Sequence, residues 1–213
     1  MDTDGLLTLT QWLSPAYPVG AFAYSHGLEG AVAAGWVRDA EVLEGWLRDV
    51  LDHGAGRNDA LFLAAAYHAD IAALAEIDTL ARALAPSRER LLETDALGAA
   101  FGTITGALWG DGVQGLTFPV ALGHAAAREG IALDLTTTLY LQAFASNLIA
   151  AGQRLLPLGQ TKAQHILRAL APLFTTIAAD TSGGDLAALS STAFLADIAS
   201  MRHETQYSRI FRT

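Results

Sequence analysis

The sequence of 213 residues contains no cysteine and a single lysine, Lys162. The lack of cysteine excludes disulfides and thiolate metal ligands, and it fits a reducing compartment. Charged residues make up only 16% of the chain, below the roughly 25% that is usual for soluble domains, while hydrophobic residues make up 52%. Chains with so few charges often cover apolar surface with a partner or with a second copy, so we expect an oligomer or a complex.

Basic residues are also scarce, with 13 against 22 acidic residues and a net charge of -9. Such a chain repels phosphate backbones, so we expect no nucleic-acid partner. Residues 1–5 are acidic and lack the basic region of a secretory signal. The uncharged stretch 135–153 contains too many polar residues for a membrane span and is predicted to be a buried helix. We therefore expect neither a secretory signal nor a membrane partner.

Helix signals recur along the chain, whereas hairpin signals are sparse. Asp39 is a typical N-cap, the residues after it place apolar side chains at helical spacing, and Gly54 ends the pattern. Similar reasoning predicts helices over residues 58–66, 71–84, 88–109, 119–130, 134–155, from 161 onward and 192–202, with a kink or break at Pro172. The predicted fold class is all-α: a single compact helical domain over residues 1–213, with roughly eight to ten antiparallel helices.

Residues 110–115 match the pattern G-x-G-x-x-G. In a dinucleotide site this pattern follows a strand and opens a helix, so that backbone N–H groups meet the phosphates. The residues before Gly110 look helical instead, so a glycine-rich loop between two helices is the favoured interpretation. No P-loop is present, and the chain is not expected to hydrolyse nucleotides.

Two other patterns leave alternatives to a non-enzymatic role. Residues 23–27, Ala-Tyr-Ser-His-Gly, are one residue short of the hydrolase pattern G-x-S-x-G, so a serine hydrolase acting through Ser25 is one alternative. A nickel-binding carrier using His26 or His203 at a surface or dimer axis is another, because imidazole suits nickel. Neither pattern comes with a recognisable base and orienting group or with H-E-x-x-H spacing. We therefore expect no catalytic residue, no cofactor and no preformed metal site.

The two ends of the chain carry its most distinctive segments. Residues 14–29 read S-P-A-Y-P-V-G-A-F-A-Y-S-H-G-L-E, and residues 203–212 read H-E-T-Q-Y-S-R-I-F-R. The second segment mixes arginines with aromatic side chains, a composition enriched at interface hot spots. A chain terminus is also where disorder concentrates, and composition alone does not separate these two interpretations.

Both end segments resemble those of the UreF-type urease accessory proteins, whose start follows S-P-x-x-P-x-G-x-F-x-x-S-x-G-L-E and whose end follows H-E-T-Q-Y-S-R-hydrophobic-F-R. The middle of the chain is similar as well, with the family's R-L-x-P-L-G-Q stretch matched at residues 154–160. The resemblance covers essentially the whole chain. Ala21, at a position where a second glycine is common, is a small departure.

The resemblance implies a cytoplasmic protein with a chaperone-like, non-enzymatic role in inserting nickel into urease. It implies a homodimer in the complex and three partners: the UreD/UreH scaffold protein, the UreG GTPase and apo-urease. Residues 203–213 are expected to form a partner-binding tail, mobile in the free protein because it offers few aliphatic side chains to a core. The expected partner-binding residues are Ser14, Pro15, Pro18, Gly20, Phe22, Tyr24, Ser25, Gly27, Glu29, Arg202, His203, Glu204, Tyr207, Ser208, Arg209, Phe211 and Arg212.

Overall fold

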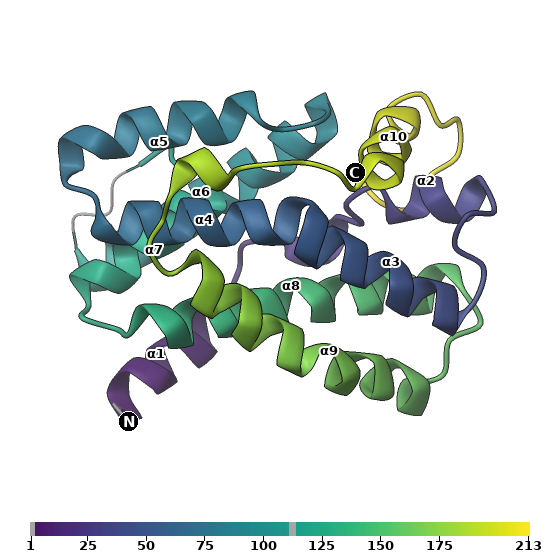
Figure 1. Ribbon diagram of the computed structural model, residues 1–213, viewed down its shortest axis with the longest axis horizontal. Coiled ribbons are helices and arrows are strands. Elements are labelled where there is room, and N and C mark those ends of the chain that lie inside the picture. Colours follow the sequence, from purple (N-terminus) through teal and green to yellow (C-terminus); the bar gives the residue numbers. More distant parts are fainter. Residues whose placement is uncertain (1–2, 111–113) are drawn as a thin grey trace.

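The computed structural model describes residues 3–110 and 114–213, which fold into ten α-helices and two short 3-10 helices (Figure 1). No strand occurs within these two ranges, and the predicted all-α class is confirmed. The elements are α1 (Thr3–Trp12), η1 (Ala21–Ala23), α2 (Leu28–Ala33), α3 (Ala40–His53), α4 (Ala55–His68), α5 (Ile71–Ala83), α6 (Arg88–Trp109), α7 (Phe118–Arg128), α8 (Leu133–Leu155), α9 (Gln160–Thr181), η2 (Leu186–Ala188) and α10 (Phe194–His203).

The central helix is α4, which contacts α3, α5, α7, α8 and α9 and crosses the middle of the molecule in Figure 1. Its sequence explains this position, because residues 60–67 carry no charge and most of their side chains are buried. A helix that is apolar on all sides is stable in water only when neighbours cover each side. Part of the uncharged sequence of this chain therefore forms its core.

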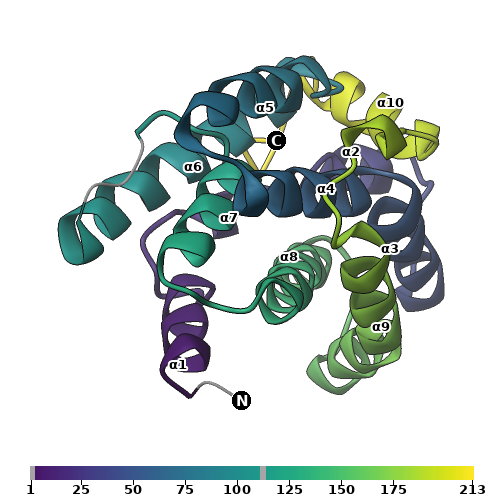
Figure 2. The same cartoon turned by 60° about the vertical axis from the view of Figure 1, so that its left-hand side comes forward.

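The uncharged stretch 135–153 lies within α8, as predicted. In Figure 2 this helix runs between α1 and α7 on one side and α3 and α9 on the other, and it contacts all four. It buries Tyr140, Leu141, Leu148 and Ile149. Across the described part of the chain, no helix is long and apolar enough to cross a membrane.

Helix boundaries match the sequence where a side chain caps the first turn. Asp39 accepts a hydrogen bond from the backbone N–H of Val42, and Ser87 accepts one from that of Arg90. The prediction that Asn58 begins a helix is wrong, because α4 begins at Ala55. Asn58 lies one turn inside it, buried, where its amide exchanges hydrogen bonds with the backbone of Ser190. Long-range pairing with residue 190 satisfies this side chain in place of a cap.

Two other boundary predictions also need correction. Asp134 does not cap α8; it lies in the first turn, after Ala132 in the cap position. Pro172 neither splits nor ends α9, which is assigned as one helix from Gln160 to Thr181. Pro172 is exposed, so water can satisfy the carbonyl group that loses its helical partner. The G-x-G-x-x-G pattern includes residues 111–113, which lie outside the described residues.

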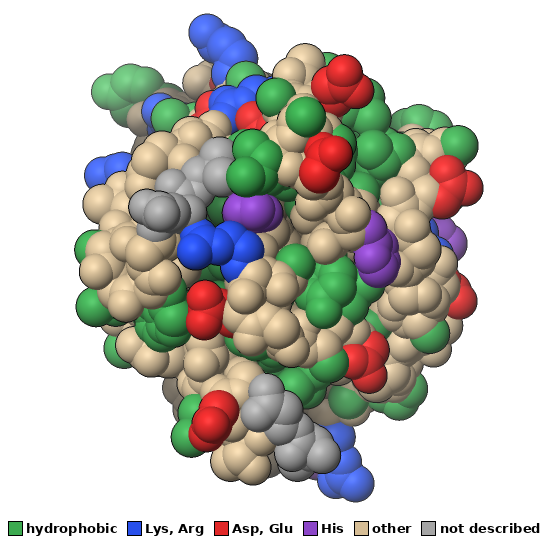
Figure 3. All heavy atoms as spheres, turned by 90° about the vertical axis from the view of Figure 1, so that its left-hand side faces the viewer, with side chains coloured by type: hydrophobic (Ala, Val, Ile, Leu, Met, Phe, Trp, Pro, Cys, Tyr) green, Lys and Arg blue, Asp and Glu red, His purple; other side chains and the backbone are tan. Residues whose placement is uncertain are grey.

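The low charge content is also visible at the surface. The face shown in Figure 3 carries isolated acidic and basic side chains, separated by hydrophobic and uncharged ones. Basic side chains do not form a continuous area on this face. Its composition is unlike the dense basic surfaces that neutralise nucleic-acid phosphates.

Candidate functional site

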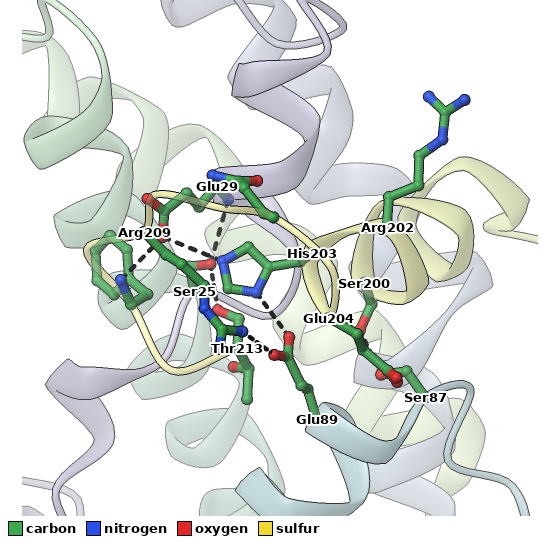
Figure 4. A network of polar contacts seen from close by, with 12 residues as sticks. Ser25, Glu29, Ser87, Glu89, Ser200, Arg202, His203, Glu204, Arg209 and Thr213 are labelled. Atoms are coloured by element: carbon green, nitrogen blue, oxygen red, sulfur yellow. Dashed lines mark hydrogen bonds and ion pairs between the residues drawn. The ribbon is translucent and has the colours of Figure 1, made fainter.

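The C-terminal tail, residues 203–213, folds back onto the body and lies beside the segment 22–29 (Figure 4). The backbone N–H of Arg212 donates to the carbonyl of Ala23 at 2.9 Å, and that of Ser25 donates to the carbonyl of Thr213 at 3.0 Å. Phe211 and Thr213 are buried. The expectation of a mobile tail is therefore wrong for this structure, because backbone hydrogen bonds and two buried side chains offset the small number of aliphatic residues.

Glu29, in the first turn of α2, anchors the tail. Its Oε1 accepts from the backbone N–H of Ile210 at 2.8 Å, and its Oε2 accepts from that of Phe211 at 2.9 Å. Oε2 also lies 3.2 Å from Nε2 of His203. Glu29 is only 5% exposed, so these hydrogen bonds replace the water that burial removes.

His203 connects this anchor to α6. The ring is fully buried, and its Nδ1 lies 2.6 Å from Oε2 of Glu89 while Nε2 faces Glu29. Each ring nitrogen of His203 therefore faces a carboxylate oxygen, one on α6 and one on α2. The other oxygen of Glu89 pairs with the guanidinium of Arg209. One imidazole thus joins α2, α6, α10 and, through Glu89, the tail (Figure 4).

A second ion pair holds the end of α10 against the start of α6. Glu204 accepts hydrogen bonds from the backbone N–H of Arg88 at 2.8 Å and from its guanidinium at 2.9 and 3.0 Å. The side-chain hydrogen bond from Arg88 lowers the pKa of the Glu204 carboxyl below its usual range. The Arg88 side chain is 88% exposed, so the pair orients the two helices but adds little stability.

Phe211 and Thr213, at the end of the tail, reach the interior of the helical body. The ring of Phe211 is buried beneath the guanidinium of Arg154, whose central carbon lies 4.2 Å from the ring centroid. The hydroxyl of Thr213 donates to Glu93 at 2.7 Å, and its carbonyl accepts from the hydroxyl of Ser25 at 2.5 Å. The end of the tail therefore packs as a core element.

Helices α2 and α10 approach closely at Gly27, which caps α2 with a φ of 77°. A Cβ atom there would lie 2.8 Å from the backbone nitrogen of Ser200 and 2.9 Å from its Cα. Both distances are shorter than real Cβ contacts allow, and both involve backbone atoms. The glycine is therefore required both by its left-handed conformation and by the α2–α10 contact.

We expect Gly27→Ala to lower the free energy of unfolding by more than about 2 kcal/mol, because strain in the left-handed region is combined with a backbone clash. Gly35→Ala is the matched control: its φ is 73°, but no atom lies within 4 Å of the added methyl group. The control should cost only the conformational strain, about 1–2 kcal/mol. Equal losses for the two variants in urea unfolding would show that the α2–α10 contact adjusts freely.

The predicted partner-binding residues divide into two groups. Those buried between the tail and the body are Tyr24, Ser25, Gly27, Glu29, His203 and Phe211, while Ser14, Gly20 and Glu204 are half-buried. Those that face outward are Pro15, Pro18, Phe22, Arg202, Tyr207, Ser208, Arg209 and Arg212. Tyr207 is fully exposed, Phe22 is 73% exposed, and Arg202 points away from the buried network in Figure 4. The first group lies where the tail and α10 meet the body, and the second group is exposed on the tail, at the end of α10 and on the loop around Phe22.

Sequence reasoning did not select four residues that complete this arrangement as site residues: Arg88, Glu89 and Glu93 on α6, and Arg154 on α8. Glu89 lies in the first turn after the Ser87 cap, where acidic residues are common for local reasons. Nothing in that pattern distinguishes a carboxylate bound to a distant tail from one that stabilises the helix start. Arg154 was included in the resemblance but not among the expected partner-binding residues.

The arrangement around Ser25 does not favour nucleophilic chemistry. Ser25 is fully buried, its hydroxyl donates to the carbonyl of Thr213, and its Oγ accepts from the backbone N–H of Glu29 at 3.2 Å. A serine nucleophile needs a base within hydrogen-bond reach and access to a substrate. The hydroxyl here supports the tail, which argues against the hydrolase alternative.

The two histidines considered for nickel are also enclosed. Both nitrogens of His203 face carboxylates, and His26 is 6% exposed with its ring edge-on to Phe144. Burial, together with the positive charge of Arg90, lowers the pKa of His26. Among the residues that the structure describes, no group of three or more His, Asp or Glu side chains is placed to hold a metal ion.

These features define an all-α protein whose C-terminal tail completes the helical body through buried polar contacts. Comparison with known proteins identifies it further. The UreF family model matches residues 37–171. The urease accessory protein UreF of Ruegeria sp. (strain TM1040) is 58% identical over 214 residues, covering 100% of both chains. That of Roseobacter denitrificans is 49% identical, covering 100% of this chain and 96% of the relative. The chain belongs to the UreF family of urease accessory proteins.

Proposed function

We propose that this protein acts by docking other proteins during maturation of the urease nickel centre, without chemistry of its own. In this role it joins the UreD/UreH scaffold protein, recruits and regulates the UreG GTPase, and presents both to apo-urease in the cytoplasm as a homodimer. Nickel is the cargo of the assembly. Family membership supports the general role, and the expected partners follow from the resemblance.

The observation that carries the proposal is the outer surface of the tail. Tyr207 and Arg212 of the tail and Arg202 at the end of α10 are exposed, and the backbone of the tail is held by buried hydrogen bonds to Glu29. Exposed tyrosine and arginine on a fixed backbone bind a partner at low entropic cost, because little has to be ordered on association. The arginines also give an acidic chain a local basic surface, which favours a partner with acidic side chains at this position. We assign this surface to UreD/UreH.

We expect Tyr207→Ala to weaken capture of UreD/UreH at least tenfold and Arg202→Ala to weaken it by a smaller factor, with the melting temperature unchanged in both. The reason is that these side chains are exposed in the free protein and become buried only against a partner. Arg38→Ala is the matched control, since the Arg38 side chain is 75% exposed on the connection between α2 and α3. The measurement is a titration of purified UreD/UreH by biolayer interferometry.

Undiminished capture by the Tyr207 and Arg202 variants would place the interface elsewhere, first at the exposed Phe22 and the loop around it. Deletion of residues 203–213 would not test the interface alone. Phe211 and Thr213 are buried, so the deletion should destabilise the body as well as remove the surface. Point variants separate these two effects.

A further inference from the structure

A cavity of about 410 Å³ lies between α1, the loop that follows it, α6 and α8. Leu9 and Leu13 line it from α1, and Leu139 and Ala143 line it from α8. Its volume falls within the range of about 300–1,000 Å³ that is typical of small-molecule sites. One polar contact of the tail, from the hydroxyl of Thr213 to Glu93, reaches its wall, whereas Glu29 and Glu89 do not line it.

One wall of this cavity is aromatic. The rings of Tyr140 and Phe144 are stacked with centroids 6.4 Å apart and an interplanar angle of 13°. The ring of Phe118 is tilted against Tyr140 at 5.8 Å. All three residues line the cavity. Aromatic faces attract cations through their negative quadrupole, and they attract neutral apolar groups by burial.

Charged side chains from α4 and α6 form the polar end of the cavity. Asp59 accepts a hydrogen bond from the hydroxyl of Tyr140 at 2.7 Å, and its other oxygen has no hydrogen-bond partner among the described residues. Arg90 and Glu93 pair with each other and are 7% and 5% exposed. Nε and Nη1 of Arg90 are buried, and Nη1 forms the ion pair with Glu93.

The charges at this end do not balance. Burial alone would raise the pKa of Glu93, but the positive charge of Arg90 holds it at about 2, so Glu93 is ionised and paired. His26, beside Glu93 at 3.8 Å, has a pKa lowered mainly by burial and is neutral. Burial raises the pKa of Asp59 to about 6, against the effects of Arg90 and Tyr140. At neutral pH the Asp59 carboxylate is therefore a negative charge without its own counter-ion.

We propose that this cavity binds a small organic ammonium ion, with Asp59 as the counter-ion and the rings of Phe118, Tyr140 and Phe144 around its apolar body. The ammonium group would donate to the oxygen of Asp59 that has no partner. The alkyl part would replace water along α1 and α8. The proposal concerns a site separate from the tail surface and does not rest on the assignment of protein partners.

The test is calorimetric titration of the full chain with cyclohexylammonium chloride, cyclohexanol and cyclohexanecarboxylate, which share an apolar body and differ in charge. At pH 7 the ammonium ion should bind at least tenfold more tightly than the alcohol, and the carboxylate should not bind. The affinity of the ammonium ion should fall about ninefold between pH 7 and pH 5, because the ionised fraction of Asp59 falls from about 90% to about 10%. The affinity of the alcohol should stay constant over this range.

Two variants distinguish the site from general adsorption. Asp59→Asn keeps an acceptor for Tyr140 but removes the charge, so the ammonium ion and the alcohol should then bind equally. Ala143→Leu fills the cavity without altering charge, and it should weaken both ligands. Absence of ammonium binding at pH 7, or an unchanged preference for it in Asp59→Asn, would overturn the proposal. If Asp59→Asn fails to fold, the pH dependence of the wild-type protein and the Ala143→Leu variant still decide the question.

Discussion

Replacement of Glu29 by alanine is expected to release the tail and to lower the free energy of unfolding by about 3–5 kcal/mol. The carboxylate accepts hydrogen bonds from the backbone N–H groups of Ile210 and Phe211 and faces His203, all from within the buried network. Alanine leaves these donors without a partner in a region from which water is excluded. The cheapest response is detachment of the tail, which exposes Phe211 and Thr213.

The measurement combines urea unfolding with limited trypsin digestion, because detachment exposes the chain after Arg209 and Arg212. Glu41→Ala is the control: Glu41 also lies in the first turn of a helix, but its side chain is 88% exposed. The control should change the free energy of unfolding by less than about 0.5 kcal/mol and leave cleavage of the tail unchanged. Slow cleavage of the tail in Glu29→Ala would mean that Phe211 and Thr213 hold it without the carboxylate.

The helical architecture could be predicted from the sequence because its signals are local. Asp39 and Ser87 each bond to a backbone N–H three residues later, so the cap and its partner lie within one turn. Asn58 shows the limit of such reasoning. It has the same chemistry as a cap, but its amide bonds to residue 190, 132 positions away. A side chain that serves a distant loop cannot be distinguished from a cap by sequence spacing.

The candidate site was partly predictable for the same reason. Both end segments stood out in the sequence, but nothing in either one indicated that Glu29 binds the backbone of Ile210 and Phe211. Backbone donors carry no residue-specific signal. The predicted mobility of the tail followed from its small number of aliphatic side chains, whereas the structure holds the tail with a buried carboxylate and the hydroxyl of Thr213.

Stability in acid is expected to depend on Glu93. Its folded-state pKa is about 2, against 4.5 for the ordinary group, because the positive charge of Arg90 outweighs the effect of burial. A lowered carboxyl pKa contributes stability that is fully present above pH 4.5 and is lost as the pH falls towards 2. The full contribution is about 3 kcal/mol, and about 2 kcal/mol of it is gone at pH 3. Asp59 acts in the opposite direction, because its pKa is raised from 3.8 to about 6. The protein therefore loses the contribution of Asp59 to its stability as the pH rises from about 3.8 through 6.

Glu93→Gln separates the two contributions. The amide can still accept from the hydroxyl of Thr213, but it leaves the charge of Arg90 buried without its counter-ion. We expect the variant to be about 3 kcal/mol less stable than wild type at pH 7 and only about 1 kcal/mol less stable at pH 3, because the wild-type protein alone loses the carboxylate term. Asp59 is present in both proteins, so its contribution largely cancels in the difference. Urea unfolding of both proteins at the two pH values gives this difference directly, and Glu41→Gln, on the exposed face of α3, should track wild type throughout. The difference in free energy of unfolding between wild type and Glu93→Gln could instead stay constant from pH 7 to pH 3. That result would show that the ionised carboxylate of Glu93 does not stabilise the charge of Arg90. It would also remove the basis for treating Asp59 as the unbalanced charge beside the cavity.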